Sequence, residues 1–130
     1  MTSNNSLSRI PTPPFVLLAD DLPEVIKSWV DTMTSFGIDC VIASSLEELN
    51  RAFDRYQDEI SAIILDGCIP GHMLNTTRFI LGARASGFSA PIVASSSSPK
   101  YRAMMMEAGC SHEAPKNKAA FLVADLLSKP

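Results

Sequence analysis

Short apolar runs alternate with stretches of helical periodicity along most of the chain. Apolar runs bounded by polar or turn-forming residues predict buried strands at 15–19, 40–43, 62–65 and 91–95, and a short polar edge strand is expected at 112–114. Between the runs, apolar residues recur every three or four positions. This spacing predicts helices at about 23–36, 45–56, 74–86, 99–108 and 118–128.

Five strand–helix units in succession indicate one α/β domain. Strands that alternate with helices form a parallel sheet with helices on both faces, which makes three layers. We expect this domain to span residues 15–130. The preceding segment, 1–14, is rich in Ser, Asn and Pro and is predicted to be flexible.

Composition excludes several classes of function. The net charge of −3 provides no basic surface for nucleic acid, and no apolar run approaches the ~20 residues of a membrane span. Residues 1–14 lack the apolar core of a signal peptide. The three cysteines have no metal-binding or redox spacing, which fits reduced thiols in the cytoplasm.

Polar side chains follow the predicted strands at the points where ligands bind in a parallel sheet. Asp20 and Asp21 follow the first strand, Asp66 the third, Ser96 the fourth and Lys116 the fifth. Three carboxylates in one cleft repel each other unless a hard cation such as Mg²⁺ binds there. A lysine and a hydroxyl beside them suit a phosphoryl group, and a carboxylate can itself be the nucleophile.

Each of these residues also has a simpler interpretation. Asp20 and Asp21 precede Pro23 and would suit the start of a helix. Ser96 lies in a run of four serines, and Lys116 alone would be a solvated lysine. The position of all of them at strand ends, in order, favours a common site.

In these residues the chain resembles the receiver domain of two-component response regulators, over about residues 15–128. The resemblance implies a flavodoxin-like (βα)₅ sandwich with a five-stranded parallel sheet in the order 2-1-3-4-5. It further implies that Asp66 accepts a phosphoryl group, with Ser96 and Lys116 contacting it. Asp21, Asp66 and the backbone carbonyl of Cys68 would bind Mg²⁺, with Asp20 acting mainly through water.

The resemblance also implies partners. The phosphoryl donor would be a histidine kinase or a phosphotransfer domain, and the receiver would catalyse its own phosphorylation and slow dephosphorylation without being a conventional enzyme. A downstream protein or a second copy would bind the face of the fourth helix, fifth strand and fifth helix. Neither nucleic acid nor a membrane is an expected partner. Because Pro130 follows the last helix closely, we expect a stand-alone receiver or part of a larger regulator or hybrid kinase.

The sequence departs from the receiver pattern at several positions. Asn117 stands where the family usually has proline, Glu113 where it has an aromatic switch residue, and residues 72–75 differ from the usual loop. These departures motivate an alternative, a degenerate receiver that binds a protein partner without phosphorylation. A cobalamin-binding domain of the same fold is disfavoured, because Cys68 occupies that family's histidine position.

Overall fold

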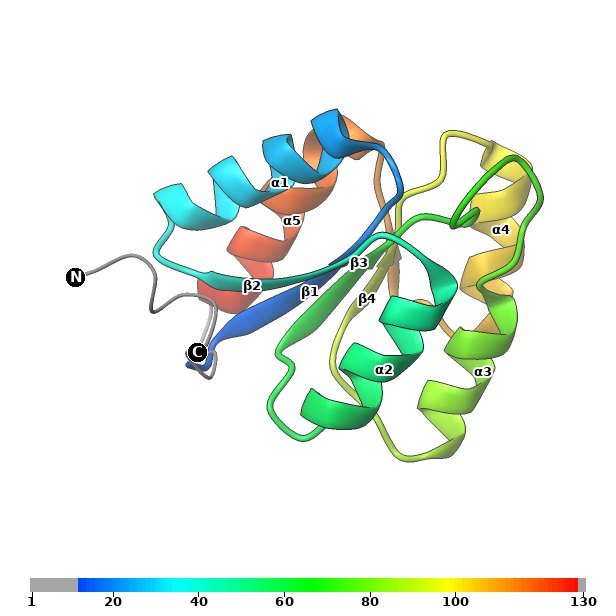
Figure 1. The fold of residues 1–130 in the computed structure, drawn as a ribbon, viewed down its shortest axis with the longest axis horizontal. Coiled ribbons are helices and arrows are strands. Elements are labelled where there is room, and N and C mark those ends of the chain that lie inside the picture. The colour runs from blue at the N-terminus through cyan, green and yellow to red at the C-terminus, as the bar shows by residue number, and fades with distance from the viewer. Residues whose placement is uncertain (1–11, 129–130) are drawn as a thin grey trace.

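Strands and helices alternate along the whole part of the chain that the structure describes, residues 12–128 of a computed structural model (Figure 1). The strands are β1 (Phe15–Ala19), β2 (Asp39–Ala43), β3 (Ala62–Leu65), β4 (Ile92–Ala94) and β5 (His112–Glu113). The helices are α1 (Pro23–Ser35), α2 (Leu46–Tyr56), α3 (Thr77–Ala85), α4 (Pro99–Ala108) and α5 (Lys116–Ser128).

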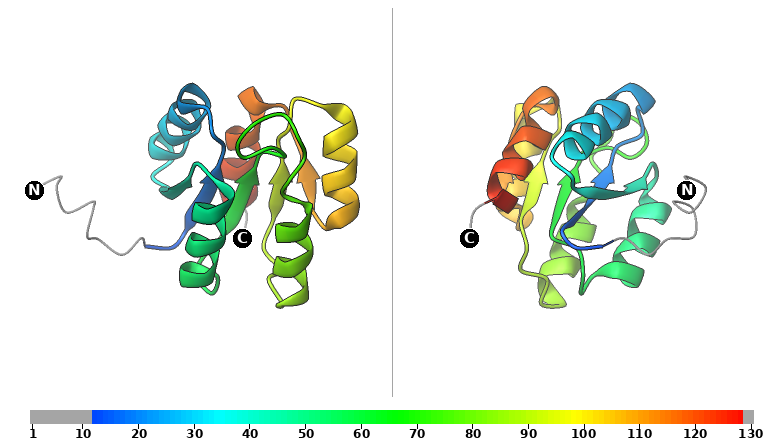
Figure 2. Two further views of the ribbon diagram at one scale, coloured as in Figure 1. Left: turned by 45° about the vertical axis from the view of Figure 1, so that its right-hand side comes forward. Right: turned by 90° about the vertical axis from the view of Figure 1, so that its left-hand side faces the viewer.

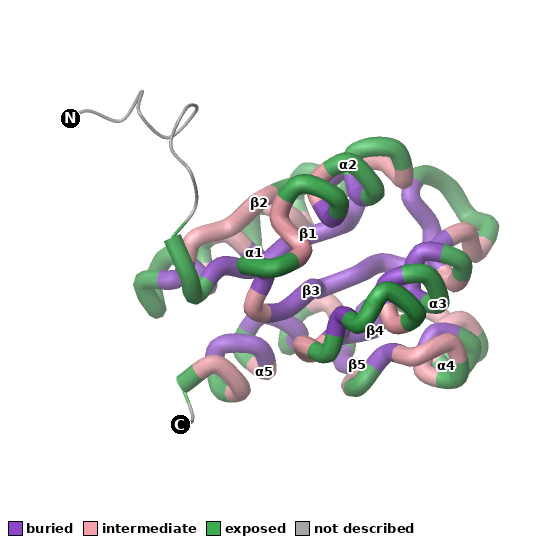
Figure 3. Tube along the Cα trace, turned by 90° about the horizontal axis from the view of Figure 1, so that it is seen from below, coloured by how far each residue is buried: buried purple, intermediate pink, exposed green. Residues whose placement is uncertain are grey.

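The five strands form one parallel sheet in the order β2-β1-β3-β4-β5. This confirms the predicted fold class and strand order. The central strands β1, β3 and β4 are buried throughout, as expected for strands covered on both faces. The short fifth strand lies at the edge, where its polar residues reach solvent (Figure 3).

Alternating side chains of the sheet fill two separate cores. Leu17 and Ile63 point to one face and pack with α2, α3 and α4, whereas Leu18 and Ile64 point to the other and pack with α1 and α5. Figures 1 and 2 show these two helical layers on opposite sides of the sheet. With helices on both faces, the carboxyl edge of the sheet is left for loops.

Helix α3 begins three residues later than predicted, at Thr77 rather than residue 74. Instead, the residues of the preceding loop form hydrogen bonds with one another. The Asn75 side chain donates to the carbonyl of Ile69 and accepts from its N–H, both at 2.9 Å, and the N–H of Asn75 donates to the Gly67 carbonyl. These bonds hold the chain out of helical geometry until Thr76.

Helix α5 begins two residues earlier than predicted, at Lys116 rather than residue 118. The carbonyl of Pro115 accepts from the N–H groups of Lys118 and Ala119, at 2.9 and 3.0 Å. A proline just before the helix removes no N–H that the helix needs, so the helix starts directly after it.

Two expectations concern the chain outside this core. The predicted flexible segment 1–14 lies, apart from residues 12–14, outside the described residues. Within residues 12–128, none of the helices combines the length and the apolar character required to cross a membrane.

Candidate functional site

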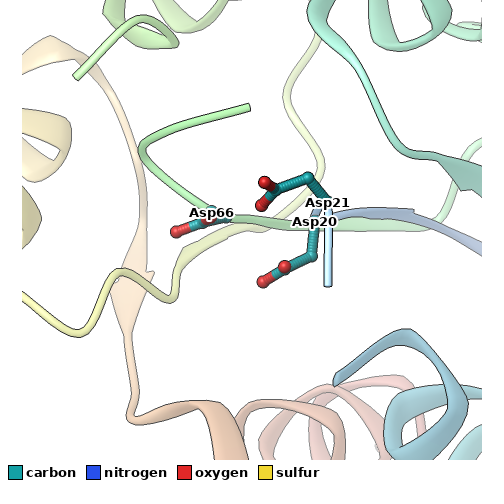
Figure 4. A group of neighbouring side chains, drawn as sticks. All are labelled: Asp20, Asp21 and Asp66. Atoms are coloured by element: carbon teal, nitrogen blue, oxygen red, sulfur yellow. The ribbon is translucent and has the colours of Figure 1, made fainter. Parts of the chain in front are cut away.

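The carboxyl ends of β1 and β3 bring three aspartates together. Asp20 and Asp21 follow β1, and Asp66 follows the neighbouring strand β3. One carboxylate oxygen from each lies within 4.8 Å of the others. Figure 4 shows the three carboxyl groups facing a common space.

Asp20 is completely buried and uses both carboxylate oxygens. Its Oδ1 accepts from the N–H of Leu22 at 2.9 Å, and its Oδ2 accepts from Nζ of Lys116 at 2.7 Å. The first bond stabilises the turn that leads from β1 into α1, so Asp20 does support the start of the helix. The second bond directs the same carboxylate into the aspartate cluster.

Asp66 combines burial with negative neighbours. It is 7% exposed, and its Oδ1 accepts from the N–H of Gly67 at 2.8 Å. Burial, followed by the charge of Asp20, raises the pKa of Asp66 to about 6, although Lys116 acts in the opposite direction. At neutral pH the carboxyl group of Asp66 is therefore mainly charged. The protonated fraction is nevertheless larger than for an exposed aspartate.

Lys116 reaches the site without a following proline. Its Nζ lies 2.7 Å from Oδ2 of Asp20 and 3.6 Å from Oδ2 of Asp66. Burial lowers the pKa of Lys116, but the hydrogen bond to Asp20 and the charge of Asp66 outweigh this, so the pKa is raised overall. The Lys116 carbonyl accepts from Nε1 of Trp29 at 2.8 Å, which ties the start of α5 to α1.

Ser96 lies at the same edge, just beyond β4. It is 3% exposed, and its Oγ accepts from the N–H of Ser98 at 3.1 Å. The Ser96 hydroxyl proton remains available for donation. Ser98 in turn caps α4, because its Oγ accepts from the N–H of Tyr101 at 3.2 Å.

Five of the six predicted site residues line one open pocket of about 490 Å³. Asp21, Asp66, Ser96 and Lys116 all contribute to it, together with Cys68. A pocket of similar volume between α2 and α3 contains none of these residues, and we assign the chemistry to the pocket with the charged groups. Asp20 is not among the residues that line the pocket, but it contacts Lys116, which is.

The Cys68 thiol has no sign of reactivity. Burial, and then the charge of Asp66, raise the pKa of the thiol, so it stays protonated at neutral pH. The described cysteines Cys40, Cys68 and Cys110 are all free. Cys68 lines the pocket, and the role of its backbone carbonyl stays a prediction.

Sequence reasoning missed several residues that support the site. The Thr76 hydroxyl is completely buried and lies 3.2 and 3.1 Å from the carbonyls of Asp66 and Gly67. The Tyr101 hydroxyl donates to the carbonyl of His72 at 3.3 Å, and Arg102 donates to the carbonyl of Ser96. All three act on backbone carbonyls, which carry no side-chain signal in the sequence.

Side chains pack closely against Gly67, next to Asp66. A Cβ atom at this position would lie 3.0 Å from Cδ1 of Leu74 and 3.3 Å from Sδ of Met105. A larger residue would therefore require these two side chains to shift by a few tenths of an ångström.

The donor set fits a hard divalent cation. Three carboxyl groups face one ammonium group, so the cluster keeps an excess of negative charge. Carboxylate and backbone oxygens are the ligands that Mg²⁺ prefers, and the open side of the pocket leaves room for the waters that it retains.

The comparisons with known proteins give a consistent fold. No family model matches the chain, and no curated protein sequence matches it. A receiver domain protein from Clostridium thermocellum superposes with a TM-score of 0.75 at 16% identity, over 88% of this chain and 91% of that one. A receiver protein from Pseudomonas putida gives 0.71 at 24% identity, over 93% and 100%.

A third solved structure is the BeF₃-activated N-terminal receiver domain of RstA from Klebsiella pneumoniae. It matches with a TM-score of 0.69 at 22% identity, over 86% of this chain and 94% of that one. At such low identities the agreement concerns the fold. The chain therefore has the fold of response regulator receiver domains, at low sequence identity to them.

Proposed function

We propose that this chain is a phospho-accepting receiver domain of two-component signal transduction. Asp66 would accept a phosphoryl group from the phosphohistidine of a histidine kinase or phosphotransfer domain, in a reaction that depends on Mg²⁺. The observation that carries the proposal is the position of Lys116 Nζ, which lies 2.7 Å from Asp20 and 3.6 Å from Asp66 in a receiver fold.

The reaction forms one bond and breaks another. A carboxylate oxygen of Asp66 attacks phosphorus, and the phosphorus–nitrogen bond to the donor imidazole breaks, which leaves an aspartyl phosphate. Lys116 offsets the charge of the transferred group, and the Ser96 hydroxyl donates a hydrogen bond to it. Slow attack by water on the aspartyl phosphate returns Asp66 to its starting form, so the domain turns over without being a conventional enzyme.

The metal would complete the charge balance. We assign its ligands to Asp21, Asp66 and the backbone carbonyl of Cys68, with Asp20 acting mainly through water. Bound there, Mg²⁺ supplies the positive charge that the equatorial oxygens of a transferred phosphoryl group require.

The proposed output surface is formed by α4, β5 and α5. Met104 on α4 is 43% exposed and Phe121 on α5 is 57% exposed, and both offer apolar contact to a downstream protein or a second copy. The free thiols fit a reducing compartment, and we propose the cytoplasm, where histidine kinases transfer their phosphoryl groups.

The alternative is a degenerate receiver that binds partners without phosphorylation. The departures at Asn117 and Glu113 motivate it. The close contact of Lys116 with Asp20 and Asp66 favours the phosphorylated receiver instead, since phosphoryl transfer uses a cation and carboxylates placed together.

The test is direct phosphorylation. The protein is incubated with Mg²⁺ and acetyl phosphate, and the intact mass is measured. We expect the addition of one phosphoryl group, its removal by hydroxylamine, which cleaves acyl phosphates, and its location on Asp66 by peptide mapping.

Two variants sharpen this experiment. Asp66→Asn should abolish the modification, whereas Asp58→Asn, which changes an exposed aspartate before β3 at the opposite edge of the sheet, should retain it. An unmodified wild-type protein, in a reaction where a known receiver is phosphorylated, would contradict the proposal.

A further inference from the structure

Ser96 is held at two points. Its hydroxyl oxygen accepts from the N–H of Ser98 at 3.1 Å, and its backbone carbonyl accepts from a terminal guanidinium nitrogen of Arg102 at 2.7 Å. Ser96 is almost completely buried, so its carbonyl depends on this donor rather than on water. A short hydrogen bond from a charged donor is among the stronger ones in proteins.

The position of Arg102 is itself well defined. It lies in the first turn of α4, where its N–H donates to the carbonyl of Ser98 at 2.9 Å. The planar guanidinium directs its nitrogens at fixed angles, so one side chain can hold two partners in a set relation.

The second partner of Arg102 is Glu113 on β5. Nε of Arg102 donates to Oε1 of Glu113 at 3.1 Å. The side chains are 22% and 49% exposed, and such a pair adds little to stability. The ion pair between Arg102 and Glu113 matters for where it lies. It connects the loop after β4 to the position on β5 where receiver domains usually have an aromatic residue.

We propose that Arg102 is a positioning residue for Ser96 and that Glu113, through Arg102, transmits the position of Ser96 to β5. This inference rests on the proposed function. When Ser96 moves toward a phosphoryl group on Asp66, its carbonyl moves too, and the guanidinium must follow it or release it. Either change alters the contact with Glu113 on the output surface, and no aromatic ring is needed.

The proposal is tested with four changes at the pair. Arg102→Gln removes the charged donor, and Arg102→Lys keeps the charge but loses the planar guanidinium with its several N–H donors. Glu113→Gln weakens only the contact between Arg102 and residue 113. The double variant Arg102→Glu/Glu113→Arg restores an ion pair that has no donor for the Ser96 carbonyl. The matched control is Arg51→Gln, which breaks an exposed arginine–glutamate pair with Glu47 on α2.

Two measurements are made on each variant, and for the wild-type protein and Glu113→Gln the NMR chemical shifts of the β5 amides are recorded as well. The first is hydrogen exchange of the Ser98 amide in the unmodified protein, since that amide donates to Ser96 Oγ. The second is the affinity for beryllofluoride in the presence of Mg²⁺.

We expect Arg102→Gln to speed the exchange of the Ser98 amide and to weaken beryllofluoride binding, each by about tenfold. Arg102→Lys and the double variant should be defective to a similar degree, within about threefold of Arg102→Gln. Glu113→Gln should speed the exchange of the Ser98 amide by less than about threefold. The same variant should remove the chemical-shift response of β5 amides to beryllofluoride.

The outcomes separate the two proposals. If Arg102→Gln behaves like Arg51→Gln in exchange and affinity, or if the double variant regains wild-type values, the role of Arg102 is refuted. If wild-type protein fails to bind beryllofluoride, the proposed function is refuted, and the exchange experiment still decides whether Arg102 holds Ser96. Circular dichroism of every variant verifies that the fold is retained.

Discussion

Asp66 must be charged to act as a nucleophile, but its surroundings favour the neutral form. Burial and the nearby Asp20 raise its pKa to about 6, from 3.8. Between these two values the folded protein binds more protons than the unfolded chain. The free energy of unfolding therefore falls as pH rises from about 4 to about 6, and stays lower above that range.

Replacing this carboxyl group should stabilise the metal-free protein above pH 6. We expect Asp66→Asn to raise the free energy of unfolding at pH 7.5 by about 1–2 kcal/mol, after allowance for solvent screening at the open pocket, and to have almost no effect at pH 4. Urea unfolding in EDTA measures this. Asp58→Asn serves as control, and a gain from Asp66→Asn that is equal at both pH values would show that the charge of Asp66 is not its source.

Lys116 should matter to stability as well as to chemistry. Asp20 is completely buried, and Lys116→Gln removes the cation beside it. We expect a loss of about 1–3 kcal/mol at pH 7, less than for a fully buried pair because the lysine is 22% exposed. Thermal unfolding tests this against Lys118→Gln, which changes an exposed lysine of the same helix and should have little effect. Equal losses in the two variants would argue against a structural role of the Lys116–Asp20 pair.

Individual residues are predictable where the side chain itself defines the site. Asp20, Asp21, Asp66, Ser96 and Lys116 each follow a strand, and the structure brings them to one edge of the sheet. Arg102 is not predictable in this way, because its partners are a backbone carbonyl and a glutamate that only the fold brings near. The role of Arg102 follows from the proximity of these groups in the fold, and their residue types alone do not indicate it.

Among the elements, the loop between β3 and α3 departs most from the sequence-based expectation. Helical periodicity predicts a start near residue 74, but Asn75 and Thr76 bond to the backbone of residues 66–69. Such local bonds compete with helix formation and leave no periodic signal. In contrast, the start of α2 has a side-chain cap, because the N–H of Glu48 donates to Ser45 Oγ at 3.1 Å.

Thr76 should therefore contribute more to the free energy of unfolding than an ordinary threonine before a helix does. Thr76→Val keeps the shape but leaves the carbonyls of Asp66 and Gly67 without their shared hydroxyl donor. We expect a loss of about 1–3 kcal/mol in the free energy of unfolding. Thr77→Val, one residue later and less buried, is the matched control, and its loss should be below about 1 kcal/mol. If the two variants lose the same stability, the loop is not held by Thr76.

At the scale of the whole molecule, the site joins parts of the fold that lie far apart in the sequence. The aspartates belong to the loops after β1 and β3, and Lys116 begins α5. The alternation of strands and helices is enough to predict the layers, and the resemblance to receivers supplies the strand order. The short β5 cannot be placed with the same clarity, because two polar residues give no periodic pattern.

A ligand shared by these parts should stabilise the entire domain. We expect Mg²⁺ at ten times its dissociation constant to raise the free energy of unfolding by about 1.4 kcal/mol. Thermal unfolding across a magnesium titration measures this. Asp21→Asn should weaken the response, whereas Asp58→Asn should leave it intact. A response that survives Asp21→Asn in full would place the metal elsewhere.

The bond between Trp29 and Lys116 makes the site optically visible. Trp29 is the single tryptophan of the chain, is buried, and donates from Nε1 to the carbonyl of the lysine that serves the pocket. Indole emission is sensitive to such a hydrogen bond and to nearby charge. We expect the fluorescence of Trp29 to change when Mg²⁺ and beryllofluoride bind, and the change to be lost in Asp66→Asn. Binding at the site can then be followed in unlabelled protein, in real time and at low concentration.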